Sequence, residues 1–149
     1  MSHDLTNDTP ADTADGVSRL NIRVYYEDTD AGGVMYYANY LKFFERGRTE
    51  WLRRLGVDHS GVAAKDHRLF VVKKVEIQYR KPAKLDDFLD IRSTIVRLGR
   101  ASIVFAQKAF RGSELLCESD IQVCCVDATT FRPIELTQDL RTLLQKAQN

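Results

Sequence analysis

The sequence predicts an α+β domain in which one long helix lies against an antiparallel sheet. Between residues 36 and 55, apolar side chains recur every three or four positions, which is the spacing of an amphipathic helix. In five other segments they alternate with polar side chains, as they do in β-strands. A single apolar helix among five strands buries its stripe best across the concave face of a curled sheet. We therefore expect a five-stranded antiparallel sheet wrapped around a long central helix.

The first half of the chain supplies one strand, a loop and the helix. Alternation predicts a strand over 19–26, followed by an acidic, glycine-containing loop over 27–33. The helix is predicted over 36–55, and Gly56 has the position of a C-terminal cap. Gly47 lies on the apolar face of this helix, which indicates that the helix approaches the sheet too closely for a Cβ atom.

The second half supplies four further strands, predicted between about residues 69 and 127. Pro82 ends the first of them, and turns at 98–100 and 111–114 separate the others. Short turns between long strands favour antiparallel hairpins.

A final helix and an open sheet edge complete the predicted fold. Thr137 has the position of an N-cap for a helix that carries Leu140, Leu143 and Leu144. One edge of the sheet would remain uncovered in a monomer. We therefore expect a homodimer joined through sheet edges, or a homotetramer.

The chain of 149 residues is long enough for one domain preceded by a tail. Residues 1–18 contain four aspartates, no lysine or arginine and no aromatic side chain. We expect this acidic tail to be disordered and residues 19–149 to form the folded domain. The domain contains 22 basic and 17 acidic residues. That excess suits a small anionic ligand but falls far short of a nucleic-acid-binding surface, so no nucleic acid partner is expected.

Cysteine usage and missing motifs exclude several classes of protein. Cys117, Cys124 and Cys125 are odd in number and two are adjacent, which favours buried structural thiols in a reducing, cytoplasmic compartment. No secretory signal is expected, and no apolar run is long enough to cross a bilayer. The sequence lacks a phosphate-binding loop, a dinucleotide-binding motif, a nucleophile elbow and zinc-ligand spacing, so neither cofactor nor metal is expected. The scattered histidines are expected to be solvated: His3, His59 and His67.

The segment 25–48, YYEDTDAGGVMYYANYLKFFERGR, is the most informative for chemistry. It places Glu27, Asp28 and Asp30 at the end of a strand, before a glycine pair and the start of the helix. A helix start offers unpaired N–H groups that polarise a carbonyl and stabilise an oxyanion. A carboxylate just upstream can act on the same carbonyl as a general base or nucleophile. The alternative is an acidic turn that only caps the helix.

The same segment resembles the signature of hotdog-fold acyl-CoA thioesterases of the 4-hydroxybenzoyl-CoA thioesterase type. It is especially similar to their Tol–Pal-associated (YbgC-like) branch. The residues that carry the resemblance are Tyr26, Asp28, Thr29, Asp30, Gly33, Val34, Asn39, Tyr40, Leu41, Phe44, Glu45 and Arg48. Later matches are 71–74, Tyr79, Pro82, Ala83, 85–87 and 123–127. The resemblance implies a hotdog fold and hydrolysis of an acyl-CoA thioester to a free acid and CoA.

The resemblance also implies two catalytic groups. Asp30 matches the catalytic aspartate, which activates water or attacks the thioester directly. The backbone N–H of Tyr37 matches the donor that polarises the thioester carbonyl. Many relatives of this branch have histidine where this chain has Tyr37, so only the backbone role carries over.

Four further positions of the motif are expected to bind substrate or to support the site. Gly33 and Val34 are expected to bind the substrate. Asn39 is expected to shape the loop, and Glu45 to pair with Arg48 three residues further along the helix.

Coenzyme A needs cationic partners for its phosphates, and no single residue is assigned to them. The candidates are Arg68, Lys73, Lys74, Arg80, Lys81 and Lys84. Two other functions on the same fold remain open. One is an enoyl hydratase or hydroxyacyl-carrier dehydratase, although such enzymes rely on a histidine near the helix start. The other is a binding module that docks acyl carrier protein or an envelope complex.

Overall fold

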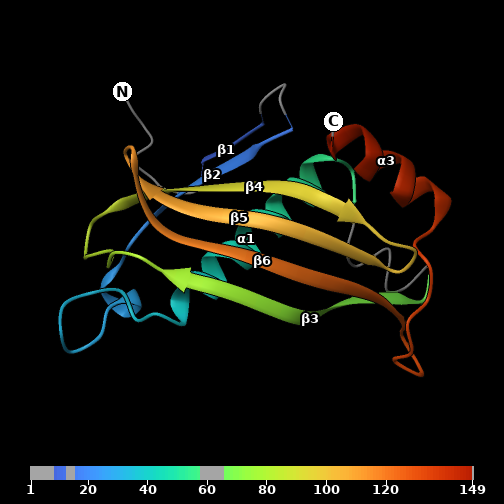
Figure 1. Cartoon of the computed structure of the whole chain (residues 1–149), viewed down its shortest axis with the longest axis horizontal. Helices are drawn as coiled ribbons and strands as arrows, with labels where there is room; N and C mark the ends of the chain where they lie inside the picture. Colours follow the sequence, from blue (N-terminus) through green and yellow to red (C-terminus); the bar gives the residue numbers. More distant parts are fainter. Residues whose placement is uncertain (1–8, 13–15, 58–65, 149) are drawn as a thin grey trace.

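The computed structural model describes residues 9–12, 16–57 and 66–148. Its strands form one antiparallel sheet in the order β1-β2-β4-β5-β6-β3 (Figure 1). Their bounds are Thr9–Asp12 (β1), Ser18–Arg23 (β2), Arg68–Tyr79 (β3), Phe88–Leu98 (β4), Ser102–Arg111 (β5) and Glu114–Asp127 (β6). The helices are α1, Asn39–Arg54, and α3, Gln138–Gln148, and a 3₁₀ turn, η2, covers Tyr26–Asp28.

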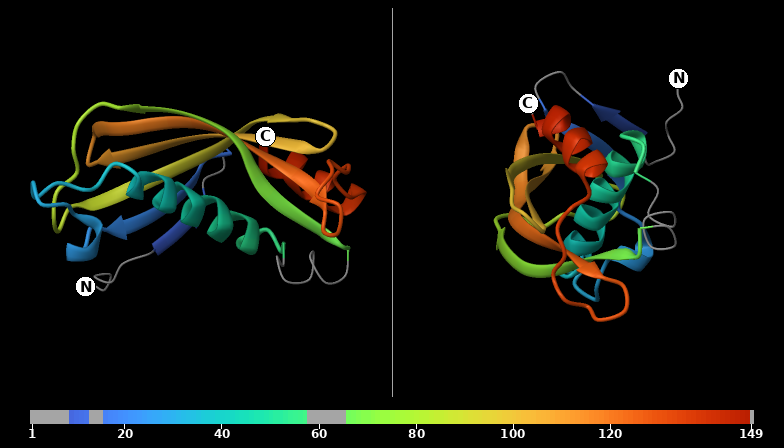
Figure 2. Two further views of the ribbon diagram at one scale, coloured as in Figure 1. Left: turned by 90° about the horizontal axis from the view of Figure 1, so that it is seen from below. Right: turned by 90° about the vertical axis from the view of Figure 1, so that its right-hand side faces the viewer.

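The predicted α+β architecture is confirmed. The sheet curls around α1, which lies along its concave side, as the end-on view in Figure 2 shows. The five predicted strands are all present as β2 to β6, and every pair of neighbours is antiparallel. This is the hotdog arrangement that the motif resemblance implies.

The tail departs from the expectation of disorder at one place. Thr9–Asp12 forms β1, which pairs antiparallel with β2 and adds a sixth strand at the sheet edge. Backbone pairing to an open edge needs no apolar side chains, and composition therefore could not reveal it. The remainder of the tail before Gly16 lies outside the described residues.

Two element boundaries also differ from prediction, for the same physical reason. The first strand ends at Arg23, and the chain then turns through η2, where Asp28 Oδ2 accepts the N–H of Tyr25 at 2.9 Å. The helix begins at Asn39, three residues later than its apolar pattern, because the N–H of Tyr36 bonds the carbonyl of Asp28 at 2.9 Å. In both places a local hydrogen bond to Asp28 replaces regular structure.

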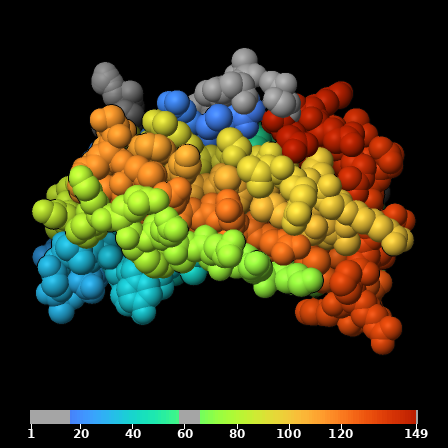
Figure 3. All heavy atoms as spheres, viewed as in Figure 1, coloured from blue at the N-terminus to red at the C-terminus, as the bar shows by residue number. Residues whose placement is uncertain are grey.

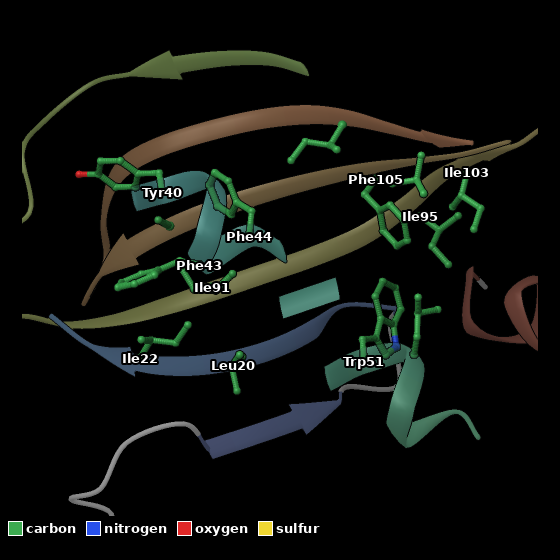
Figure 4. Packing of buried hydrophobic residues seen from close by; sticks show 14 of the residues in the cluster. Leu20, Ile22, Tyr40, Phe43, Phe44, Trp51, Ile91, Ile95, Ile103 and Phe105 are labelled. Atoms are coloured by element: carbon green, nitrogen blue, oxygen red, sulfur yellow. The ribbon is translucent and has the colours of Figure 1, made fainter. Parts of the chain in front are cut away.

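The core is formed by the apolar stripe of α1 and the inner face of the sheet. Tyr40, Phe43, Phe44 and Trp51 are each no more than 3% exposed and point into this layer (Figure 4). A Cβ atom on Gly47 would lie 3.0 Å from Ile91 and 3.3 Å from the side chains of Gln107 and Ser93. The predicted close approach of helix and sheet is therefore confirmed. The predicted caps also form: Gly56 has φ +98°, and Thr137 Oγ1 accepts the N–H of Leu140.

A polar network is buried beneath the middle of α1. Arg48, 7% exposed, donates to Gln107 Oε1 at 2.9 Å, and Gln107 Nε2 donates to the Phe44 carbonyl and to Ser93 Oγ, each at 2.8 Å. Burial lowers the pKa of the Arg48 guanidinium, and the charge of Glu45 opposes this. The hydrogen bonds of these two side chains go to other partners, Gln107 for the Arg48 guanidinium and Thr49 for Glu45, while the Glu45 carboxylate interacts with Arg48 through its charge.

The remaining sequence expectations concern cysteines, histidines and membrane segments. All three cysteines are free and buried, and burial raises the pKa of Cys117 to about 12. His67 is exposed, with Nε2 2.6 Å from Thr129 Oγ1, whereas His3 and His59 lie outside the described residues. Among the helices of the described ranges, none is long and apolar enough to span a membrane.

Strand β3 forms the edge of the sheet opposite β1. It pairs with β6 along one side, and its other side carries no strand within the described part of the chain. Figure 3 shows β3 along the lower margin of the outer face, which no helix covers over β3 and β6. Beside this edge, a groove of about 350 Å³ runs between α1 and β3 and is lined by Leu41, Lys42, Glu45, Arg48, Val72, Val75 and Ile121.

Candidate active site

The two aspartates of the acidic loop differ in their hydrogen bonds and in their exposure to solvent. The side chain of Asp28 accepts the Tyr25 N–H and its carbonyl accepts the Tyr36 N–H, so Asp28 holds the loop together. Asp30 is exposed, and its Oδ1 accepts the N–H of Gly32 at 2.8 Å. The Asp30 carbonyl accepts the Gly33 N–H at 3.0 Å, which closes a tight turn. This leaves one oxygen of the Asp30 carboxylate available for chemistry.

The start of α1 provides the second predicted group. The N–H of Tyr36 bonds Asp28, and that of Asn39 bonds the Tyr36 carbonyl at 2.9 Å. The intervening N–H of Tyr37 has no hydrogen-bond acceptor within residues 9–12, 16–57 and 66–148. An N–H group at a helix start that lacks a partner carries partial positive charge and can receive an oxyanion.

A cavity of about 300 Å³ brings Asp30 and Tyr37 together. It is lined by Asp30, Val34, Met35, Tyr37, Tyr40, Tyr79, Arg80, Lys81 and Pro82. The predicted substrate-binding residue Val34 is among the lining residues, whereas Gly33 is not. Gly33 instead supplies the left-handed backbone of the turn, with φ +81°.

Aromatic rings form much of the cavity wall. The ring of Tyr79 contacts Tyr37 edge to face at 5.6 Å between centroids and Tyr40 at 5.6 Å. Tyr36 and Tyr37 are also in contact, at 5.0 Å. Tyr36, Tyr37 and Tyr79 are all exposed, so the rings surround an opening that solvent and ligand can reach. Burial raises the pKa of both the Tyr40 and the Tyr79 hydroxyl above its ordinary value.

The two supporting positions of the motif lie on different sides of α1. Asn39 is 7% exposed, and its side-chain amide donates to the Asp28 carbonyl at 2.9 Å, which connects the start of α1 to the acidic loop. Glu45 faces the groove beside β3 and does not line the cavity.

Some cavity residues were not predicted as site residues because they are distant in the sequence. Tyr79 is the last residue of β3, and Arg80, Lys81 and Pro82 follow it, about 50 residues after Asp30. In the sequence, Tyr79 and Pro82 are only positions of the family motif, and Arg80 and Lys81 are only candidates for binding the phosphates of coenzyme A. The pairing of β3 with β6 brings this corner of the chain beside α1.

The loop after β3 is fastened by ion pairs. Arg111 contacts Asp87 Oδ2 and Glu114 Oε1, each at 2.7 Å, and Lys81 contacts Glu114 Oε2 at 2.7 Å. Hydrogen bonds from Lys81 and then Arg111 lower the pKa of Glu114 from 4.5 to about 2. Arg80 forms a further ion pair with Glu118. No group of three or more histidine, cysteine or acidic side chains in the described ranges could hold a metal.

The depressed pKa of Glu114 predicts a pH-dependent contribution to stability. Such a carboxylate stabilises the fold above its unfolded pKa of 4.5, and the contribution is lost as the pH falls towards about 2. Glu114→Gln should therefore lower the urea midpoint at neutral pH, and the gap to wild type should close across that acidic range. Glu76→Gln, whose carboxylate has a looser 3.9 Å contact with Lys74, is the control and should give a small gap. A gap for Glu114→Gln that persists at the acid end would contradict this assignment.

The fold agrees with what comparison with known proteins shows. A model of the thioesterase superfamily matches residues 32–118, and the chain belongs to this superfamily. It is accordingly a hotdog-fold thioester hydrolase.

Within the superfamily the chain is YbgC-like. It is 41% identical over 120 residues to an acyl-CoA thioesterase YbgC from Haemophilus influenzae, covering 80% of this chain and 88% of the relative. It is 42% identical over 123 residues to an acyl-CoA thioester hydrolase YbgC from Escherichia coli O157:H7, covering 82% of this chain and 91% of the relative. A crystal structure of a probable thioesterase from Bartonella henselae superposes with a TM-score of 0.76 at 34% identity, covering 80% of this chain and 98% of that one. The predicted resemblance to YbgC-like acyl-CoA thioesterases is thus confirmed.

Proposed function

We propose that the protein hydrolyses acyl-CoA thioesters to a free acid and CoA, with Asp30 and the N–H of Tyr37 as the catalytic groups. The observation that supports this most is the shared cavity, which both residues line at the start of α1. The YbgC relatives, which are named for acyl-CoA thioesters, support the substrate class.

In the proposed reaction, the Tyr37 N–H stabilises the oxyanion and Asp30 transfers the proton. The thioester carbonyl oxygen accepts a hydrogen bond from the Tyr37 N–H, which stabilises the oxyanion as the tetrahedral intermediate forms. Asp30 takes a proton from the attacking water and returns it to the sulfur when the C–S bond breaks. In the alternative route Asp30 itself attacks and a mixed anhydride is then hydrolysed. Incorporation of ¹⁸O from labelled water into the Asp30 carboxylate identifies the second route with water attacking the aspartyl carbonyl of the anhydride.

The binding surface of the proposed substrate combines apolar and basic groups. Tyr37, Tyr79 and Val34 offer apolar contacts for the acyl group. Arg80 and Lys81 line the same cavity on the side of β3, and besides their ion pairs with Glu118 and Glu114 they offer further N–H donors to an anionic carrier. The substrate proposed here carries an apolar acyl group and an anionic carrier, and the cavity wall is complementary to both.

The function is tested by thiol release from short, long and aromatic acyl-CoAs, with hydration of crotonyl-CoA measured in parallel. Thiol release without hydration is the expected result. Hydration without thiol release would point to a hydratase. Failure of both, together with retention of acyl carrier protein in a pull-down, would point to a binding module. The three buried free thiols support the expected cytoplasmic location, because a reducing compartment keeps them reduced.

We further propose that the enzyme is a homodimer in which β3 pairs with β3 of a second copy. The edge of β3 is 12 residues long, and antiparallel pairing of identical strands forms a closed two-fold assembly. The apolar groove between α1 and β3 adjoins this edge, so the second copy would cover it as well.

Val72→Asp is expected to convert the dimer to monomer. Val72 lies on β3, is 51% exposed and lines the groove, so an aspartate is tolerated in the monomer but buried in the dimer. An unpaired buried carboxylate costs roughly 2 kcal/mol or more, about 30-fold in the dissociation constant. Val96→Asp is the matched control, because Val96 on β4 is 52% exposed. Light scattering should give twice the chain mass for wild type and control, and the chain mass for Val72→Asp. A Val72→Asp protein that keeps the wild-type mass would exclude this interface, and four times the chain mass for the wild type would indicate a tetramer.

A further inference from the structure

The hydroxyl group of Tyr40 connects the catalytic helix to the loop after β3. Tyr40 is the second residue of α1 and is 3% exposed. Figure 4 shows its ring beside the phenylalanines of α1 and its hydroxyl directed away from them. That hydroxyl accepts the N–H of Ala83 at 3.1 Å and lies 3.4 Å from the carbonyl of Lys81.

Ala83 in turn holds the segment between the two catalytic groups. Its carbonyl accepts the N–H of Met35 at 2.7 Å, and the neighbouring Val34 pairs with Lys84. Met35 lies between Asp30 and Tyr37 and is 3% exposed, and Ala83 is fully buried. Both polar backbone groups of Ala83 are therefore engaged, one by Tyr40 and the other by the catalytic loop.

We propose that the Tyr40 hydroxyl is a positioning group that fixes Met35, and through it Asp30 and the Tyr37 N–H, in their reactive arrangement. This inference rests on the proposed function for its catalytic consequence. Without the hydroxyl, the buried Ala83 N–H loses its acceptor, and the loop must shift to bring that N–H to water. Such a shift moves the partner of Met35 and alters the distance across the cavity from Asp30 to the Tyr37 N–H. Rate is sensitive to this distance, since a displacement of about 1 Å costs on the order of 10²-fold.

Tyr40→Phe removes the hydroxyl and keeps the ring that lines the cavity. It is expected to lower kcat about 10- to 100-fold while KM changes less than about threefold. The control is Leu144→Ala, which opens the core under α3 at the end of the molecule opposite the acidic loop (Figure 1). Both variants should be destabilised, but Leu144→Ala should keep kcat within about twofold of wild type at a temperature where all are folded. An unchanged kcat in Tyr40→Phe, or an equal loss in Leu144→Ala, would overturn the proposal.

Hydrogen exchange at the Met35 amide tests the same link without relying on activity. In Tyr40→Phe this amide should exchange at least about tenfold faster than in wild type, while amides of β4 remain unchanged. Equal Met35 exchange in the two proteins would refute the positioning role whatever the kinetics show. If wild type releases no thiol from any acyl-CoA but Met35 exchange still rises, the proposed function fails and the positioning of the loop by Tyr40 stands.

Discussion

Asp30→Asn is expected to keep the fold and to lower turnover by about 10²–10⁴-fold, the usual contribution of a general base. The amide cannot take a proton from water or form an anhydride, yet its oxygen can still accept the N–H of Gly32 that holds the side chain at 2.8 Å. Because Asp30 is exposed, the substitution leaves the core intact. Circular dichroism and a melting curve should therefore match those of wild type, while thiol release is largely lost.

Asp28→Asn is the matched control for this prediction. Asp28 lies two residues away and bonds the N–H groups of the loop, but it does not line the cavity. The amide oxygen of the substituted side chain can accept the same Tyr25 N–H, so most turnover should remain. An equal loss in both variants would show that the wrong carboxylate has been assigned to the chemistry.

Gln107→Ala is expected to give the largest loss of stability, about 3 kcal/mol in the free energy of unfolding. Gln107 is fully buried and is the acceptor for the Arg48 guanidinium. Its removal leaves a buried positive charge without that partner and strips Ser93 and the Phe44 carbonyl of a donor. Urea denaturation measures the change, and Gln145→Ala on the exposed face of α3 should be close to neutral.

A second substitution separates loss of the network from loss of packing. Arg48→Met in the Gln107→Leu background removes the charge together with its acceptor, so the double variant should be more stable than Gln107→Ala. Buried polar networks are often replaced by apolar side chains at little cost when every member is removed. A double variant that is less stable than Gln107→Ala would mean that the destabilisation comes from packing and not from an uncompensated charge.

Patterns local in sequence predicted most of the fold. The apolar stripe of α1, the alternation in β4 and the cap at Thr137 each depend on neighbours a few residues away, and each has the expected structure. The start of α1 could not be predicted so closely, because the Asn39 side chain bonds a carbonyl eleven residues earlier. The inward orientation of the Arg48 side chain could not be predicted from the sequence either, since its acceptor Gln107 is 59 residues away.

In the candidate site, too, some residues were predictable from local patterns and others depend on contacts between distant parts of the chain. Asp30 and Tyr37 are seven residues apart, and their common placement follows from a turn before a helix start. Tyr79 and Lys81 reach the same cavity only through the long pairing of β3 with β6, which alternation alone does not specify. The hydrogen bond between Tyr40 and Ala83 joins residues 43 positions apart, so only the folded structure reveals it.

The most direct measurement is thiol release from a panel of acyl-CoAs by wild type and Asp30→Asn side by side, at matched concentration of folded protein. Wild type should turn over at least one member of the panel, and Asp30→Asn should lose at least about 10²-fold of that rate. Equal rates for the two proteins would contradict the role of Asp30. The absence of release by either protein from every acyl-CoA would contradict the proposed substrate class.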